Sequence, residues 1–168
     1  SLQRIVLSPK TSPNLQLWQA PQPKSFDIAP IQTLGQAMQE KNSDPKVSVI
    51  IPSFNHAQYI EKAIQSVLDQ EYSNLELIIS DDGSSDNTAD VLEKYKNKNS
   101  ITVLLHEQNR GQSASINDAL KVATGDFISF LPSDDWYLPN KTSLQIKKFQ
   151  SCSEAVGVVY GKGLRYYE

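Results

Sequence analysis

Two pairs of adjacent aspartates stand out among the residues that could do chemistry. Asp81 and Asp82 lie in the run SDDGSSDNT, and Asp134 and Asp135 lie in the run PSDDWYLP. Neighbouring carboxylates repel each other, so keeping both ionised favours a cation or strong hydrogen-bond donors nearby. A hard divalent ion such as Mg²⁺ or Mn²⁺, held partly by substrate phosphates, meets that need, while Asp82 could instead accept from a nucleobase or ribose donor. Together the two pairs predict a site for a nucleoside diphosphate with a metal ion.

Each acidic loop also has a purely structural explanation. Ser85 or Asp86 is a good N-cap for a following helix, and Asp82 with Gly83 is an ordinary turn pair. The second aspartate pair could likewise only shape a turn before Pro139, which sits well at the first position of a helix. For either loop alone this explanation is the better one, because short motifs match by chance. The combination of the two loops is what points to a ligand.

These loops need a scaffold, and short apolar runs predict five strands. The expected strands are residues 47–51, 75–79, 101–105, 127–131 and 156–160, most of them apolar on both faces. Four apolar faces with helical spacing lie between them, formed by Ile60, Ala63, Ile64, Val67 and Leu68, by Val91, Leu92 and Tyr95, by Ile116, Ala119, Leu120 and Ala123, and by Leu144 and Phe149. This alternation predicts a doubly wound α/β fold with a mostly parallel sheet. Ligands bind beyond the carboxyl ends of the strands in such sheets, so the loops after the strands are expected to share one edge.

The first 45 residues differ in composition from the rest. Six of the nine prolines lie there among polar residues and short apolar runs, which is typical of an N-terminal arm or linker. Leaving Trp18, Phe26 and Ile28 in water would be costly, so we expect parts of this arm to pack on the body of the protein. We also expect a short helix near residues 31–39. The remaining residues, 46–168, are predicted to form one α/β domain.

The bulk properties of the chain exclude several classes of protein. Its 168 residues suffice for one buried core, and a formal net charge of −3 gives no basic field to attract nucleic acid. A single cysteine, Cys152, and two histidines cannot form an internal disulfide or a structural zinc site. No apolar run is long enough to cross a bilayer, and the chain has no signal-peptide pattern. We therefore expect a cytoplasmic protein, free or at the membrane surface, with its oligomeric state open.

Three longer stretches, in the same order, resemble one enzyme family. VSVIIPSFNHAQYIEKAIQSVLDQ, LELIISDDGSSDNT and NRGQSASINDALKVATGDFISFLPSDDWYLP are similar to the N-terminal half of the family 2 glycosyltransferases, which have the Rossmann-like GT-A fold. The turn after Ile51 contains no glycine, whereas a dinucleotide dehydrogenase needs a G-x-G-x-x-G turn there for its pyrophosphate. The resemblance therefore favours a sugar-nucleotide enzyme over a dehydrogenase.

The resemblance implies roles for the nucleotide-binding residues. Pro52 and Phe54 match the turn that lies against the nucleotide base, although Phe54 could equally be a packing residue. Asp82 matches the residue that reads the base through a ring N–H. Arg110 matches a loop near the diphosphate, where an arginine could help to neutralise the leaving group.

The second acidic pair matches the end of the family's metal-binding motif. The resemblance places Asp134 on the ribose and beside the metal, and Asp135 on the metal, which would be Mg or Mn. The family commonly has an aspartate where this chain has Pro132, which leaves the strength of metal binding open.

Four further side chains receive weaker assignments. The two histidines, His56 and His106, are assigned to the surface or to packing. Trp136 and Tyr137 could face a sugar, but an apolar anchor for their loop is at least as good an explanation.

The resembled enzymes mostly transfer a sugar with inversion. An acceptor hydroxyl attacks the anomeric carbon, a carboxylate removes its proton, and a metal stabilises the departing diphosphate. The family's base and acceptor-binding segments lie beyond the fifth strand, and this chain ends at Glu168, so we assign no catalytic residue here. We expect the domain to be truncated at its C-terminal side, to bind UDP weakly with Mn or Mg, and not to transfer sugar alone.

The implied partners are a nucleotide-sugar donor, expected to be a UDP-sugar, and a saccharide or other hydroxyl acceptor. Two other hypotheses stay open at this point. One is a non-catalytic nucleotide-sugar-binding or interaction module with the same fold, and the other is a different α/β protein that binds NAD or a flavin.

Overall fold

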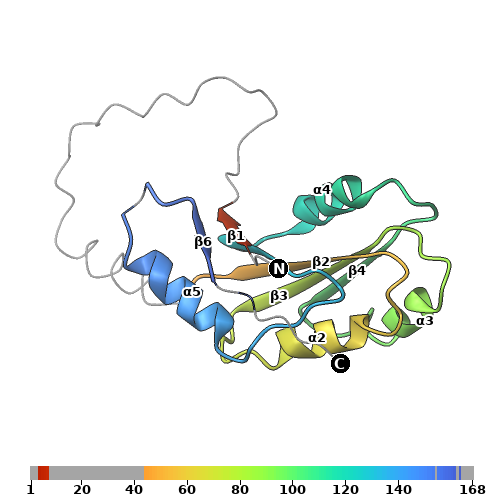
Figure 1. Ribbon diagram of the computed structural model, residues 1–168, viewed down its shortest axis with the longest axis horizontal. Helices are drawn as coiled ribbons and strands as arrows, with labels where there is room; N and C mark the ends of the chain where they lie inside the picture. The colour runs from red at the N-terminus through yellow and green to blue at the C-terminus, as the bar shows by residue number, and fades with distance from the viewer. Residues whose placement is uncertain (1–3, 8–43, 154, 162, 164–168) are drawn as a thin grey trace, which may run out of the picture. The chain divides into compact units, whose positions relative to one another are not determined.

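The computed structural model describes residues 4–7, 44–153, 155–161 and 163. Its centre is a six-stranded sheet with the order β4-β3-β2-β5-β1-β6 (Figure 1). The strands are β1 (Arg4–Leu7), β2 (Val47–Ser53), β3 (Leu75–Asp81), β4 (Ile101–Leu105), β5 (Phe127–Phe130) and β6 (Val158–Tyr160). Strands β2 to β5 pair in parallel, while β1 runs antiparallel to both β5 and β6. The prediction of a mostly parallel α/β sheet is therefore confirmed.

Helices cover both faces of the sheet. They are α2 (Ile60–Leu68), α3 (Thr88–Glu93), α4 (Gln112–Val122) and α5 (Lys141–Gln150). Helix α4 lies on one face, and α2, α3 and α5 lie on the other (Figure 1). None of the helices in the described residues is both long and apolar enough to cross a membrane.

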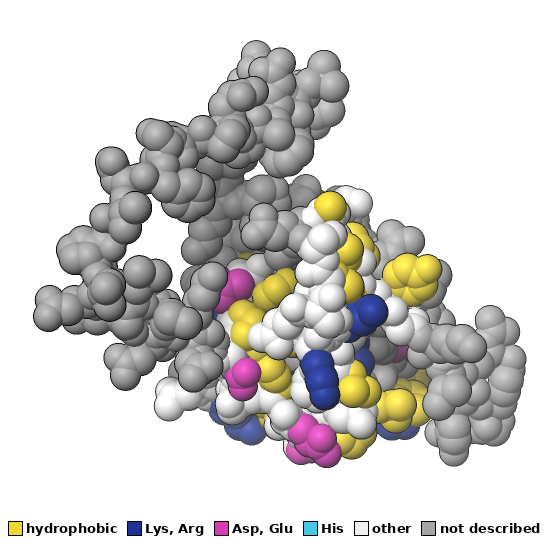
Figure 2. Space-filling model, turned by 90° about the vertical axis from the view of Figure 1, so that its left-hand side faces the viewer, with side chains coloured by type: hydrophobic (Ala, Val, Ile, Leu, Met, Phe, Trp, Pro, Cys, Tyr) yellow, Lys and Arg dark blue, Asp and Glu magenta, His cyan; other side chains and the backbone are white. Residues whose placement is uncertain are grey.

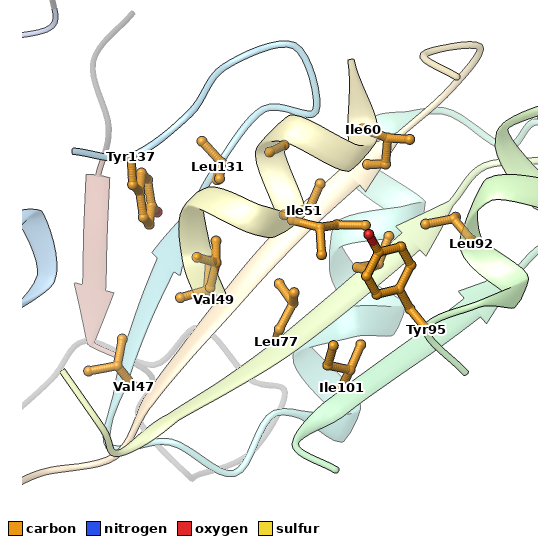
Figure 3. Close-up of a cluster of buried hydrophobic side chains, with 14 of the residues drawn as sticks. Val47, Val49, Ile51, Ile60, Leu77, Leu92, Tyr95, Ile101, Leu131 and Tyr137 are labelled. Atoms are coloured by element: carbon orange, nitrogen blue, oxygen red, sulfur yellow. The ribbon is translucent and has the colours of Figure 1, made fainter. Parts of the chain in front are cut away.

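Alternation along the central strand divides the core between these two faces. Val47, Val49 and Ile51 of β2 point to the face covered by α2 and α3, where Figure 3 shows Ile60 and Leu92 among the buried side chains. On the opposite face Ile50, Ile78 and Ile128 pack with Ala119 of α4. Because both faces are buried, all seven residues of β2 are buried, which explains its nearly continuous apolar sequence.

Several element boundaries differ from the sequence prediction. Strands β2 and β3 each continue two residues further than expected, to Ser53 and Asp81, and β6 begins two residues later than expected. The parallel pairing of β2 with β3 extends to Ser53 and Asp81, so the polar ends of these strands are ordered by ladder hydrogen bonds. Strand β1 was not predicted, because its residues were assigned to the N-terminal arm.

Helix α5 presents a different face to the core than its apolar residues suggested. Leu144 was expected in the buried face but is 57% exposed, so that expectation was wrong. The buried positions are Thr142, Gln145, Ile146 and Phe149, with the spacing of one helical stripe. The main-chain N–H and the hydroxyl of Thr142 donate to Oε1 of Gln70, at 3.0 and 2.8 Å. These hydrogen bonds satisfy the polar groups of Thr142, so this residue can be buried.

The helix starts also differ in detail from the prediction. Asn140 is the N-cap of α5, so Pro139 precedes the cap and is not the first helical residue. Asn87 is the N-cap of α3, but Asp86 accepts a 2.9 Å hydrogen bond from the main-chain N–H of Thr88 and so performs the expected capping. Figure 2 shows the end of the molecule that carries α5 and β6, where apolar, basic and acidic side chains are interspersed over the described residues.

The edge of the sheet opposite the predicted site is held by Glu76. Its carboxylate pairs with Nζ of Lys46 at 2.6 Å and accepts hydrogen bonds from Ser48 and from both donors of Thr124. Burial alone would raise the pKa of Glu76, but these donors outweigh it and lower the pKa to about 2. The predicted helix near residues 31–39 and the packing of Trp18, Phe26 and Ile28 lie outside the described residues.

Candidate functional site

A cavity of about 220 Å³ lies at the carboxyl ends of β2, β3 and β5. This is the edge at which open α/β sheets bind ligands. The cavity is lined by Pro52, Ser53, Phe54, His56, Asp82, Asn109, Gln112, Ser115, Pro132, Ser133 and Asp134. Its lining comes from the end of β2, from the loops that follow β2, β3, β4 and β5, and from the N-terminal part of α4, so only the folded sheet brings these residues together.

Four of the six predicted site residues share this cavity. Pro52, Phe54, Asp82 and Asp134 line it, whereas Arg110 and Asp135 are not among its lining residues. Phe54 is 42% exposed, so within the described residues it is not part of the apolar core. An exposed aromatic ring beside a nearly buried carboxylate suits a flat ligand with a polar edge.

The loops after β2 and β3 are joined by side-chain hydrogen bonds. Asn55, which has a φ of 54°, accepts hydrogen bonds from the main-chain N–H groups of Ser85 at 2.8 Å and Asp86 at 3.3 Å. Asparagine tolerates this left-handed conformation better than most residues do. In the opposite direction, the main-chain N–H of Ala57, in the loop after β2, donates to the Asp86 carboxylate, in the loop after β3, at 3.1 Å. The loops that carry the lining residues Phe54 and Asp82 are therefore tied to each other by hydrogen bonds.

Asp81, the last residue of β3, and Asp82, which follows it, have separate roles. The Asp81 carboxylate accepts hydrogen bonds from the main-chain N–H and the hydroxyl of Ser84, at 3.0 and 2.6 Å, and so shapes the turn. Asp82 instead lines the cavity and accepts a 3.0 Å hydrogen bond from the main-chain N–H of Arg110. Hydrogen-bond donors therefore compensate part of the repulsion expected between these neighbouring carboxylates.

Gly83 makes the contact between Asp82 and Arg110 possible. Its φ is +69°, and a Cβ at this position would lie 2.6 Å from the main-chain carbon of Gln108. Only glycine allows both the left-handed conformation and this close approach. The turn after β3 can therefore pack directly on the loop after β4, which carries Arg110.

The Arg110 guanidinium lies on Asp118 of α4. The two side chains form an ion pair, and the Arg110 side chain is 44% exposed. Hydrogen bonds from Lys121 and then Arg110 lower the pKa of Asp118 to about 2. Arg110 thus reaches the site through its main chain, while its charge is held beside the cavity.

Both histidines lie closer to the site than the sequence analysis assigned them. His56 lines the cavity, and its Nδ1 lies 2.6 Å from the Ser133 hydroxyl. The His106 ring lies between Asp82 and Asp118. Their positions in the sequence could have indicated this, because each histidine closely follows a strand and so lies at the edge of the sheet where ligands bind.

The second acidic pair lies in the loop after β5, at the same edge of the sheet as the cavity. Asp134 lines the cavity, and the main-chain N–H of Asp135 donates to the Pro132 carbonyl at 3.0 Å in a tight turn. Among the described residues, no three His, Cys, Asp or Glu side chains are grouped closely enough to hold a metal by themselves. A Mg²⁺ or Mn²⁺ site made of one or two carboxylates and substrate phosphates needs no such group, so the donor set fits that kind of site.

Trp136 and Tyr137 anchor the acidic loop rather than line the cavity. Nζ of Lys62 lies 3.5 Å from the centre of the Trp136 ring. The Tyr137 side chain is buried, and its hydroxyl lies 2.6 Å from that of Ser129. Of the two explanations offered from the sequence, the structure favours the anchor.

Comparisons with known proteins agree with this geometry. The family model described as Glycosyl transferase family 2 matches residues 48–166. The Escherichia coli protein UDP-Glc:alpha-D-GlcNAc-diphosphoundecaprenol beta-1,3-glucosyltransferase WfgD is 44% identical over 103 residues, which are 61% of this chain and 40% of that protein. The Campylobacter jejuni GalNAc(5)-diNAcBac-PP-undecaprenol beta-1,3-glucosyltransferase is 37% identical over 122 residues, which are 71% of this chain and 38% of that protein. The chain thus spans less than half the length of these curated relatives.

Solved structures give the same result. S. aureus TarS 1-349 in complex with UDP matches with a TM-score of 0.59 and 33% identity, over 63% of this chain and 32% of that one. The mannosyltransferase PcManGT from Pyrobaculum calidifontis, in complex with GDP-Man and Mn²⁺, matches with a TM-score of 0.55 and 26% identity, over 72% of this chain and 34% of that one. The sheet order, the cavity at the strand ends and the family match lead to one conclusion: the chain belongs to glycosyl transferase family 2.

Proposed function

We propose that residues 46–168 bind the donor of an inverting glycosyltransferase, which transfers a sugar from a UDP-sugar to an acceptor hydroxyl with the help of a divalent metal. The observation that carries this proposal is the meeting of Phe54, Asp82 and Asp134 in one cavity. These residues are separated by 28 and 52 positions in the sequence, so local structure alone does not explain their convergence.

The end of the cavity at Asp82 suits a nucleobase. The Asp82 side chain is only 4% exposed, and an ionised carboxylate can only accept hydrogen bonds. A base with a ring N–H, such as uracil, supplies the donor that this carboxylate lacks. The exposed ring of Phe54 offers a surface for the face of that base.

The end at Asp134 and Asp135 suits the ribose and diphosphate. Two carboxylates beside a diphosphate form a cluster of like charges, so a cation is needed for all of them to stay ionised. A bound Mg²⁺ or Mn²⁺ would supply that charge and stabilise the leaving diphosphate. Asp134 and Asp135 would hold the metal, and Asp134 would also accept from a ribose hydroxyl. The acceptor and the residue that removes its proton are not assigned to this chain.

Calorimetry with UDP, in the presence and absence of Mn²⁺, tests this proposal. We expect binding in the micromolar to millimolar range with Mn²⁺, about tenfold weaker binding in Asp82→Asn, and unchanged binding in Asp90→Asn. Asp90 is a matched control because it is an exposed acid on α3, outside the cavity lining. If NAD or a flavin bound and UDP did not, the donor-site assignment would be wrong.

A further inference from the structure

The orientation of the Asp82 carboxylate depends on its neighbours. The torsion that orients an aspartate carboxylate has a broad preference, so contacts decide the plane of the group. Oδ1 of Asp82 accepts the 3.0 Å hydrogen bond from the main-chain N–H of Arg110. A carboxylate that is 96% enclosed needs further compensation for its charge, because burying an unpaired charge is costly.

His106 provides a second contact to this carboxylate. The residue directly follows β4, and its main-chain N–H donates to the Asp81 carbonyl at 3.0 Å. Its ring lies between two acids, with Nδ1 3.7 Å from Oδ1 of Asp82 and Nε2 3.3 Å from Oδ2 of Asp118. Nδ1 is buried and makes no hydrogen bond to any group in the described residues. The ring is therefore positioned against Asp82 by its other nitrogen.

Asp118 holds both groups that approach Asp82. It pairs with the Arg110 guanidinium and with Nε2 of His106, and Nζ of Lys121 lies 2.7 Å from its Oδ1. With a pKa lowered to about 2 by Lys121 and Arg110, Asp118 is ionised at neutral pH and can only accept. Nε2 of His106 lies 3.3 Å from Oδ2 of this acceptor. One residue on α4 thus fixes the His106 ring and the chain at Arg110.

We propose that Asp118 and His106 are positioning residues that set nucleobase choice by fixing the direction in which Asp82 accepts a hydrogen bond. Neither residue lines the cavity, so both act through Asp82. Uracil presents an N–H at ring position 3, whereas cytosine presents a lone pair there. A carboxylate held in this orientation therefore accepts a hydrogen bond from uracil and repels the lone pair of cytosine. A carboxylate that has turned away distinguishes the two bases poorly. This inference rests on the proposed function and adds the residues that decide base specificity.

Calorimetry of UDP and CDP binding with Mn²⁺ tests the inference in four forms of this chain. We expect the wild type to prefer UDP, and we expect Asp118→Asn and His106→Gln each to reduce the UDP-to-CDP affinity ratio about tenfold. Lys121→Met is the matched control, since Lys121 contacts Asp118 through a side chain that is 74% exposed and forms no ion pair with any other acid in the described residues. It should leave the ratio unchanged. Binding of inorganic pyrophosphate with Mn²⁺ should be the same in all four forms.

The outcomes separate the inference from the proposed function. An unchanged UDP-to-CDP ratio in both Asp118→Asn and His106→Gln would overturn the inference while leaving the proposed function in place. Parallel loss of UDP and pyrophosphate binding would also overturn it, because that pattern indicates general damage to the fold. A wild-type chain that binds pyrophosphate but shows no preference for UDP would overturn both. The two variants lie on different elements, so misfolding of one leaves the other to decide.

Discussion

The main-chain N–H of Arg110 donates a 3.0 Å hydrogen bond to Oδ1 of Asp82, across 28 residues of sequence. This contact joins the loop after β3 to the loop after β4 at the wall of the cavity. It depends on Gly83, which lets the two loops approach each other. The geometry of the cavity therefore depends on a residue that contributes no side chain to it.

Gly83→Ala should destabilise the fold and weaken UDP binding together. The left-handed φ of +69° and the 2.6 Å approach to Gln108 are both incompatible with a Cβ. Each kind of strain costs about 1–3 kcal/mol, so we expect a loss of about 2–4 kcal/mol in unfolding free energy. Urea denaturation and UDP titration would measure the two effects. Gly157→Ala is the control, because a Cβ there meets nothing within 4 Å; an equal effect of both variants would contradict the prediction.

Asp135→Ala should remove the metal dependence of UDP binding while leaving the fold intact. The residue lies in a turn after β5, and its main-chain N–H, which the variant retains, makes the 3.0 Å hydrogen bond to Pro132. We expect UDP binding in the variant to be equal with and without Mn²⁺, and the thermal midpoint to change little. Calorimetry at several Mn²⁺ concentrations is the measurement. Persisting metal dependence would assign the metal to other ligands.

Glu76→Gln should lower stability most at neutral pH. The pKa of Glu76 in the folded protein is about 2, below its ordinary value of 4.5, so its contribution is fully present above pH 4.5 and is lost as the pH falls toward 2. We expect the variant to lose about 1–3 kcal/mol at pH 7 and to approach the wild type near pH 2. Denaturation from pH 2 to 7 tests this, with the exposed Glu71→Gln as control. A deficit that does not depend on pH would contradict the role of the charge.

The unfolding free energy of Lys141→Met should exceed that of the wild type by the largest amount at and below neutral pH. Burial lowers the pKa of Lys141 from 10.5 to about 7, and its ammonium lies 2.7 Å from the Ser129 hydroxyl and 3.6 Å from the centre of the Tyr137 ring. Between pH 7 and 10.5 the unfolded chain binds a proton that the folded chain does not, so wild-type stability rises with pH in this window.

Denaturation of both forms at pH 7, 8.5 and 10 measures this linkage. The stability difference between Lys141→Met and the wild type should shrink as pH rises, by at most about 1.4 kcal/mol per pH unit. Lys148→Met, an exposed lysine on the same helix, should show a difference that is constant with pH. Identical pH profiles for the two variants would show that Lys141 is charged in the folded protein throughout this range.

Much of the scaffold could be predicted from the sequence because its signals are local. The apolar run from Val47 to Ile51 is buried on both faces of the sheet. The predicted apolar face of α2 is buried at Ile60, Ala63, Ile64 and Val67, but the expectation for Leu68 was wrong, because that residue is 44% exposed. Since the strands alternate with helices, a parallel sheet and a ligand edge follow from chain connectivity. The family resemblance then picked out Pro52, which lines the cavity, from that edge.

The local signals failed where polar residues replace apolar ones in packing. Leu144 belongs to the exposed side of α5, because Thr142 and Gln145 are buried through hydrogen bonds that periodicity cannot reveal. Strand β1 was missed for a related reason, since its pairing with β5 and β6 is a long-range contact. When the pairing partners of a strand are distant in the sequence, the only local signal for the strand is a few apolar residues.

The sequence by itself determined to within two residues where β2 and β3 end, and hence that Asp82 and Asp134 would lie at one edge of the sheet. Only the tertiary structure decided that Asp81 shapes a turn while Asp82 faces the cavity, and that Arg110 contributes its main chain while its guanidinium lies on Asp118. The same is true of His106, whose place between Asp82 and Asp118 depends on how α4 packs against the sheet. The physical reason is that the partner of a hydrogen bond or an ion pair is chosen by distance and direction in space, and neither is encoded in the spacing of residues along the chain.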